Sequence, residues 1–174
     1  MPFNKQHYIV GTKITQTNLD FIIALLGDLP INSIRNMAVI LFAAPDFMRV
    51  VHDKLVSLDF FNVIQPTKSS LLQTGNVYLL AHNTPIALKD DVIYLPQTTE
   101  KTDENHHFEV LAATYHKNFI QLIWDENQTQ ITTDTTILVS QNTEVESLKN
   151  QLLLAVAQAD LFNLMSIFTI YTHR

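Results

Sequence analysis

The sequence predicts an α/β protein with three α/β/α layers, a doubly wound and mostly parallel central sheet, and one β-hairpin. Short apolar runs of strand length alternate with segments in which apolar residues recur at helical spacing. Residues 38–42 (AVILF) are continuously apolar, the pattern of a strand buried on both faces of a parallel sheet. No linker, repeat or low-complexity segment divides the 174 residues, so we expect one domain over residues 1–174.

The first strand is expected at residues 7–10, with Gly11 marking the bend at its end. Thr17 is predicted to be the N-cap of the helix that follows, and Pro30 ends this segment because proline cannot continue a helix. The apolar positions of the helix are three or four residues apart and define one face: Leu19, Ile22, Ile23, Leu26 and Leu29. A strand, a turn and an amphipathic helix are therefore expected to open the chain.

The second strand leads into a helix that begins at Pro45, a residue suited to the first helical turn, and its apolar side runs from Phe47 to Leu58. Further strands are predicted at residues 62–64, 77–81, 119–124 and 136–139, a hairpin at 86–89 and 92–95, and helices at 108–116 and 145–158. The remaining segments are predicted loops, at residues 65–75, 96–107 and 125–135, and an apolar tail at 161–174 that fits either a strand or a helix.

Composition excludes several classes of function. The net charge is -6, from 17 acidic and 11 basic residues, and Lys and Arg nowhere cluster, so a nucleic-acid partner is not expected. The longest apolar run, residues 38–44, has seven residues, whereas a membrane-spanning helix needs about 20, so no membrane span is expected. The N-terminus lacks the basic and apolar regions of a secretory signal, and the chain has no cysteine. We therefore expect a cytoplasmic protein without disulfide or thiolate chemistry.

Five stretches of the chain follow one another in an order that a known family shares. Residues 9–30 (IVGTKITQTNLDFIIALLGDLP) match a strand, a turn of the form G-x-S-x-G-G and a helix ending in L-P. Residues 38–47 (AVILFAAPDF) match a strand that ends in Q-H before a helix, and residues 74–95 (TGNVYLLAHNTPIALKDDVIYL) match a G-x-V-Y-x-x-P segment with a hairpin. Residues 109–123 (EVLAATYHKNFIQLI) match a helix and the strand that follows it. Residues 137–148 (ILVSQNTEVESL) match a strand followed by a glutamine. In this order the chain resembles the catalytic domain of the chemotaxis receptor methylesterases, the CheB family.

The resemblance implies an activity for which this chain lacks the residues. Members of the CheB family hydrolyse the methyl esters of receptor glutamates, and some deamidate receptor glutamines, with a Ser-His-Asp triad. Carried over by position, the serine falls on Lys13, the histidine on Phe42 and the aspartate near Thr129. Thr15 and Gln16 replace two glycines that let main-chain N–H groups approach an oxyanion. We therefore expect a catalytically inactive, methylesterase-like domain that serves as a protein-interaction or signalling module, in chemotaxis or another pathway.

The candidate site is a pocket at the carboxyl ends of the predicted strands, with Gly11, Thr12, Lys13, Phe42 and Trp124 as its candidate residues. Two other hypotheses use the same pocket. One is a hydrolase of different chemistry, with Lys13 as a nucleophile; the other is a small-ligand sensor in which Lys13 binds an anion. For the interaction module, the expected partner is another protein or a second copy of this chain. No cofactor is expected.

Histidines are the remaining candidates for site chemistry. His106 and His107 are adjacent, with His116 further along. Neighbouring side chains point in different directions, and no cysteine or suitably spaced carboxylate completes a tetrahedral ligand set. We therefore expect no metal site, and we interpret His106 and His107 as an exposed pair in a loop.

Overall fold

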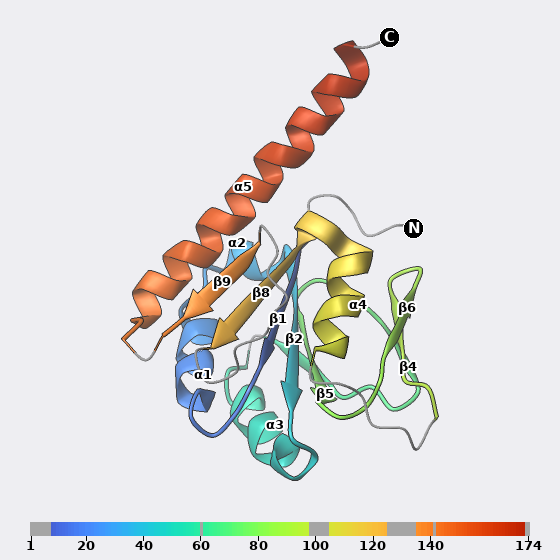
Figure 1. The fold of residues 1–174 in the computed structure, drawn as a ribbon. Helices are drawn as coiled ribbons and strands as arrows, with labels where there is room; N and C mark the ends of the chain where they lie inside the picture. The colour runs from blue at the N-terminus through green and yellow to red at the C-terminus, as the bar shows by residue number, and fades with distance from the viewer. Residues whose placement is uncertain (1–7, 60, 98–104, 125–134, 141, 173–174) are drawn as a thin grey trace.

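The structure, a computed structural model, describes residues 8–59, 61–97, 105–124, 135–140 and 142–172. At its centre is a six-stranded sheet with the strand order β3-β5-β2-β1-β8-β9, in which every neighbouring pair is parallel (Figure 1). Its strands are β1 (Tyr8–Lys13), β2 (Met37–Ala43), β3 (Asn62–Ile64), β5 (Asn76–Ala81), β8 (Phe119–Trp124) and β9 (Thr136–Val139). The chain moves outward from β1 to β2 and β3 and later continues on the other side of β1 with β8 and β9, so the sheet is doubly wound.

A second, antiparallel sheet has the strand order β4-β7-β6, with β4 at Ser69–Leu71, β6 at Ala87–Lys89 and β7 at Val92–Tyr94. Strands β6 and β7 form the predicted hairpin. Its turn is made by Asp90 and Asp91, whose φ angles of 52° and 61° are both left-handed, as a two-residue hairpin turn requires.

Helices cover both faces of the central sheet (Figure 1). They are α1 (Leu19–Asp28), α2 (Ile31–Ile34), α3 (Met48–Val56), α4 (His106–Tyr115) and α5 (Val145–Thr172), with single 3₁₀ turns η1 (Pro45–Phe47) and η2 (His116–Asn118). Side chains of α1, α3 and α5 share one apolar core with one face of the sheet, while α4 and the small sheet share a second core with the other face. This arrangement confirms the predicted three-layer α/β/α fold with a mostly parallel sheet.

Helix α5 begins beside β9 and extends well beyond the sheet, as the orange-to-red helix of Figure 1 shows. It covers the predicted helix at 145–158 and continues to Thr172, so the tail that fitted either a strand or a helix is helical up to that residue. Among the described residues, no helix combines the length and the apolar character that crossing a bilayer requires.

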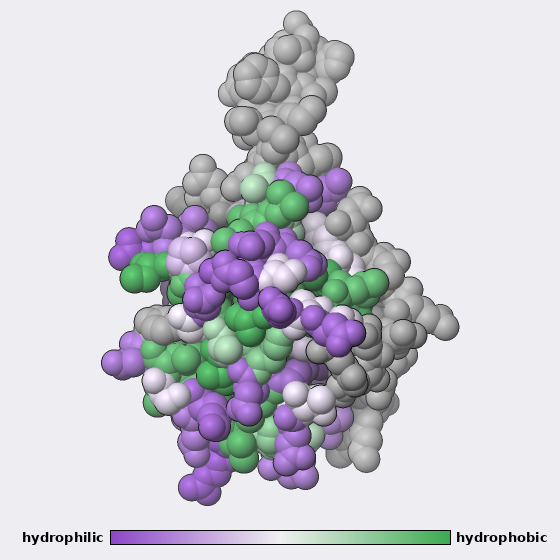
Figure 2. Space-filling view, turned by 90° about the vertical axis from the view of Figure 1, so that its left-hand side faces the viewer, coloured by the Kyte–Doolittle hydropathy of each residue, from purple (hydrophilic) through white to green (hydrophobic). Residues whose placement is uncertain are grey.

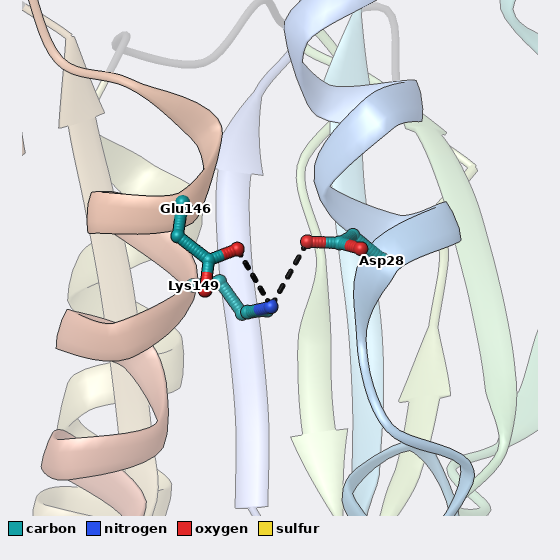
Figure 3. Close-up of polar contacts among 3 residues, drawn as sticks. All are labelled: Asp28, Glu146 and Lys149. Atoms are coloured by element: carbon teal, nitrogen blue, oxygen red, sulfur yellow. Dashed lines mark hydrogen bonds and ion pairs between the residues drawn. The ribbon is translucent and has the colours of Figure 1, made fainter.

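The first turns of α5 are attached to α1 by apolar packing and an ion pair. Leu148 and Leu152 are fully buried in the core that α5 shares with α1. Next to them, Nζ of Lys149 lies 2.8 Å from Oε2 of Glu146 and 3.0 Å from Oδ2 of Asp28, the last residue of α1 (Figure 3). The hydrogen bonds to Glu146 and Asp28 favour the charged ammonium and so raise the pKa of Lys149.

Gly11 has a different role from the predicted one. It does not form a bend: β1 continues to Lys13, and Gly11 pairs with Ile40 on one side and Gln121 on the other. A Cβ atom at Gly11 would lie 2.8 Å from Cε1 of Phe119, closer than real Cβ contacts allow. Glycine is needed here because the buried Phe119 ring packs directly on the backbone of β1.

The start of α1 also differs from the prediction. Asn18, not Thr17, is the N-cap residue. The Asn18 side chain accepts a hydrogen bond from Thr15 N (2.8 Å) and donates one to Lys13 O (3.0 Å). These bonds hold the turn before the helix, so the helix begins one residue later than the capping pattern indicated.

Two further elements lie where the sequence predicts loops. Strand β4 lies inside the segment predicted as a loop at 65–75, and it forms because Ser70 pairs with Ile93 of β7 in the small sheet. Helix α4 begins at His106 rather than Phe108, so both adjacent histidines are helical instead of lying in a loop. In both places the contacts that decide the structure come from residues distant in the sequence.

Candidate functional site

A cavity of about 600 Å³, which we call the site cavity, opens at the carboxyl ends of β1, β2 and β5. Its walls come from these strand ends, the turn before α1 and the start of α3. The lining residues are Lys13, Ile14, Thr15, Gln16, Phe42, Ala44, Asp46, Phe47, Val50 and His82. The carboxyl ends of the strands are where open α/β sheets bind ligands, so the cavity lies at the expected edge.

Lys13 and Phe42 lie side by side in the wall of the site cavity. They are register partners in the parallel β1–β2 pair, so their side chains point to the same face of the sheet. The pairing continues one residue further, where Ile14 N donates to Phe42 O at 2.9 Å. The sheet itself therefore places a lysine and a phenylalanine at neighbouring backbone positions on the same face.

The far side of the site cavity is formed by the start of α3 and the end of β5. Phe47 N donates to Ala44 O at 2.9 Å, which closes the short η1 turn and places Asp46 in the lining. His82 N donates to Ala43 O at 2.9 Å, which extends the β2–β5 pairing by one residue and brings the half-buried His82 to the cavity. Neither Asp46 nor His82 is a candidate that sequence reasoning identified, because strand pairing and the η1 turn bring them there.

His107 supports the Phe42 side of the cavity from α4. It is 1% exposed, and its ring stacks on that of Phe42 with the centroids 4.4 Å apart. Its Nε2 lies 2.6 Å from Thr84 O, and because a carbonyl oxygen can only accept, Nε2 carries the proton. The expectation of an exposed histidine pair is therefore wrong for His107. The signal for its burial is its position one residue before Phe108 and four before Leu111, which are also buried.

Burial makes His107 a weak base. Desolvation, followed by the nearby charges of His106, Lys13 and His82, lowers its pKa from 6.5 to about 4, although the hydrogen bond to Thr84 acts in the opposite direction. His107 is therefore neutral at pH 7. The neighbouring His106 is half-buried and has Nε2 3.2 Å from both the N and the O atoms of Ile86, which attaches α4 to the segment before β6.

The other candidate pocket residues lie outside the site cavity. Gly11 and Thr12 are buried within β1, and Trp124 ends β8 on the α1 face of the sheet. Trp124 Nε1 donates to Thr12 Oγ1 at 2.9 Å, and this hydroxyl donates to Leu122 O at 3.0 Å. The indole also packs edge-on against Phe21, with the ring centroids 5.4 Å apart. Trp124 is therefore bonded and packed within the core.

The position implied for the aspartate, Thr129, lies outside the described residues. Among the residues that are described, Thr15 belongs to the cavity lining, and its Oγ1 is buried without a hydrogen-bond partner. No imidazole is thus positioned to deprotonate it, as nucleophilic catalysis requires.

Within the described part of the chain, no group of three His, Cys, Asp or Glu side chains is arranged to hold a metal ion.

Comparison with known proteins relates the fold of this chain to a solved structure. No protein-family model matches the chain, and no curated protein matches its sequence. Among solved structures, the crystal structure of the Thermotoga maritima CheB methylesterase catalytic domain is similar, with a TM-score of 0.58 and 13% sequence identity over 90% of this chain and 98% of that chain. At this identity the similarity concerns the fold alone. The chain therefore has the α/β fold of a CheB methylesterase catalytic domain.

Proposed function

We propose that this chain is a catalytically inactive, methylesterase-like domain that binds a small ligand in the site cavity. The observation that carries the proposal is the register pairing of Lys13 with Phe42 at the cavity wall. By the resemblance, these two positions would hold a serine and the histidine that deprotonates it. A lysine ammonium supplies no alkoxide and a phenyl ring accepts no proton, and loss of either group alone costs several orders of magnitude in rate.

Binding can take the form of protein contact or of small-ligand binding, and the surface favours the second. Among the residues whose side chains the structure describes, the exposed large apolar ones are scattered over six elements: Ile31, Val50, Val56, Leu71, Tyr94, Leu138 and Leu154. On the face shown in Figure 2, apolar surface is interrupted by polar side chains. The site cavity, by contrast, brings polar and apolar groups together in one concave place, the arrangement typical of small-molecule sites. A role in a signalling assembly remains a prediction from the sequence.

An esterase assay on the full chain tests the absence of catalysis. The substrates are p-nitrophenyl acetate and a peptide that carries a glutamate γ-methyl ester. We expect no turnover above the buffer rate from the wild type, from Lys13→Ala or from Lys54→Ala. Lys54 is an exposed lysine of α3 and serves as the matched control for reaction at a surface amine. Turnover that Lys13→Ala abolishes and Lys54→Ala leaves intact would overturn the proposal.

A further inference from the structure

We propose that two copies of this chain form a symmetric dimer through the part of α5 that extends beyond the sheet, with the two helices antiparallel. The inference goes beyond the proposed function, because it concerns α5 rather than the site cavity. Its evidence is a change of the apolar side along α5, the spacing of the apolar residues, and the fit of this helix to a second copy of itself.

In its first turns, α5 packs one apolar side on the domain. Leu148, Leu152 and Ala159 are buried in the core that α5 shares with α1. The opposite side begins with polar residues, the exposed Ser147 and Asn150. The start of α5 is therefore an amphipathic helix of the ordinary kind, apolar toward the core and polar toward solvent.

From Leu154 onward, the side of α5 that faces away from the core becomes apolar. Leu154 is 58% exposed, and Ala157, three residues later, is exposed as well. The same spacing of three and four residues continues to the end of the helix, and we call this set the α5 stripe: Leu154, Ala157, Leu161, Leu164, Phe168 and Tyr171. These residues occupy the a and d positions of consecutive heptads, the pattern by which two helices pack side by side.

The α5 stripe runs along a helix that leaves its own domain. The helix continues to Thr172, and Figure 1 shows its last part extending past the sheet. Helices in proteins are stabilised mainly by packing of an apolar face, and isolated helices shorter than about 12–15 residues are marginal in water. A second helix packed along the α5 stripe supplies this stabilisation.

A second copy of α5 fits the stripe when the two helices run antiparallel. In the register centred on residues 161–164, Ala157 meets the partner's Phe168, and Leu154 meets the partner's Tyr171. A small residue then faces a large one, as close packing requires. Parallel helices would instead place Ala157 on Ala157 and Phe168 on Phe168, with a gap in one layer and crowding in the other. The stripe is therefore complementary to itself in the antiparallel orientation, which gives a twofold-symmetric interface.

The α5 stripe also offers enough surface for a stable dimer. Aromatic side chains bury about 150–250 Å² each, and the interface contains Phe168 and Tyr171 from both copies. These side chains supply about half or more of the roughly 1,200 Å² that the smaller specific interfaces bury. The leucines of the stripe add to this area.

The polar side of the same helix favours a protein partner over a lipid surface. Helices that lie on membranes carry Lys and Arg on their polar side, where these residues attract anionic lipids. The polar residues of the last turns of α5 are instead Asn163, Ser166 and Thr169, and residues 150–172 contain no Lys or Arg. Asp160, the one charged residue in this range, is repelled by an anionic lipid surface.

Sedimentation velocity of the full chain over a range of micromolar concentrations tests the dimer. We expect a dimer in the wild type, and Phe168→Gln should weaken it at least about thirtyfold, because both copies lose a central aromatic anchor. Ile170→Gln is the matched control: it removes an apolar residue from the other side of the helix and should leave the dimer unchanged. A monomeric wild type, or equal weakening by the two substitutions, would overturn the inference.

Introduced cysteines report the orientation of the two helices, because the chain has none of its own. In a mixture of Leu154→Cys and Tyr171→Cys chains, oxidation should link the two variants to each other. Tyr171→Cys alone should stay unlinked, since antiparallel helices place these two residues at opposite ends of the interface. Ready linking of Tyr171→Cys to itself would indicate parallel helices and contradict the inference, as would a mixture that stays unlinked.

Vesicles test the lipid alternative. The full chain is sedimented with phosphatidylcholine vesicles that either lack or contain phosphatidylserine, and we expect it to stay in the supernatant with both. Vesicle binding that Phe168→Gln abolishes and Ile170→Gln preserves would assign the α5 stripe to a membrane surface and overturn the proposed dimer.

Discussion

On the α1 face of the central sheet, two buried polar side chains, those of Trp124 and Thr12, bond to one another. Trp124 donates to Thr12, and Thr12 donates to a main-chain carbonyl, within a core that is otherwise apolar. On the α4 face, buried His107 lies in the field of Lys13 and His82, next to an open cavity. On the first face, Trp124 and Thr12 satisfy their polar groups without charge. The second holds a titratable group whose pKa is lowered by burial and by its electrostatic interactions with His106, Lys13 and His82, and such groups are frequent at functional sites. The comparison teaches that burying an imidazole makes the stability of the α4 face depend on pH, whereas the bonded Trp124 and Thr12 carry no such dependence.

The largest expected effect concerns His107 and pH. Its pKa is 6.5 when unfolded and about 4 in the folded chain, so between these values the unfolded chain binds more protons. The contribution of His107 to the free energy of unfolding is therefore fully present above pH 6.5 and is lost as the pH falls toward 4, by about 3 kcal/mol in total. Urea unfolding at a series of pH values should show this loss in the wild type and a shallower one in His107→Gln.

The charge on Lys13 should modulate this pH dependence, because it is one of the causes that lower the pKa of His107. We expect Lys13→Met to reduce the loss of stability between pH 6.5 and 4, and the matched substitution Lys54→Met to leave it as in the wild type. If His107→Gln keeps the full pH dependence, the stability of the α4 face does not depend on this imidazole and the contrast between the two faces disappears.

A smaller effect is expected where β1 meets Phe119. In Gly11→Ala the new Cβ would lie 2.8 Å from the Phe119 ring, so the free energy of unfolding should fall by about 2 kcal/mol, as overpacking a core usually costs. Gly27→Ala in α1 is the matched control, because its Cβ meets Leu58 at an ordinary 3.6 Å. Alanine favours a helix, so the control should gain up to about 1 kcal/mol. Both values come from urea unfolding.

The outcome of these glycine substitutions separates packing from backbone effects. Combining Gly11→Ala with Phe119→Leu removes the ring that the Cβ meets, so the double variant should lose less than the two single losses added together. Strict additivity would contradict the close approach of Phe119 to β1.

The smallest effect is expected at the junction of α1 and α5. Lys149 is 17% exposed, while Asp28 and Glu146 are largely in solvent, so the ion pairs are screened. Lys149→Met should lower stability less than Gly11→Ala, and the difference from the wild type should shrink in 1 M NaCl. Lys68 is an exposed lysine directly before β4, outside α1 and α5, and Lys68→Met should show no such salt dependence. A loss in Lys149→Met that equals that of Gly11→Ala would mean that this ion pair, rather than Leu148 and Leu152, holds α5 in place.

Local patterns in the sequence determined most of the elements. The continuous run at residues 38–42 predicts a buried central strand, and β2 is that strand. Asp90 and Asp91 predict a hairpin turn, and both adopt the left-handed conformation that such a turn needs. The alternation of strands and helices predicts the three layers. These features depend on neighbouring residues, which the linear sequence shows directly.

Tertiary contacts decided the packing around Gly11, the burial of His107 and the composition of the site cavity. Nothing next to Gly11 in the sequence shows that Phe119 packs on it, and nothing next to His107 shows that Phe42 covers its ring. Likewise, Lys13 and His82 both line the site cavity because β1 pairs with β2 and β2 pairs with β5. The sequence by itself predicts that Lys13 and Phe42 stand where the resemblance implies a serine and a histidine. That they form one wall, with His107 behind it, follows only from the register of the sheet and the packing of α4, because both join residues far apart in the chain.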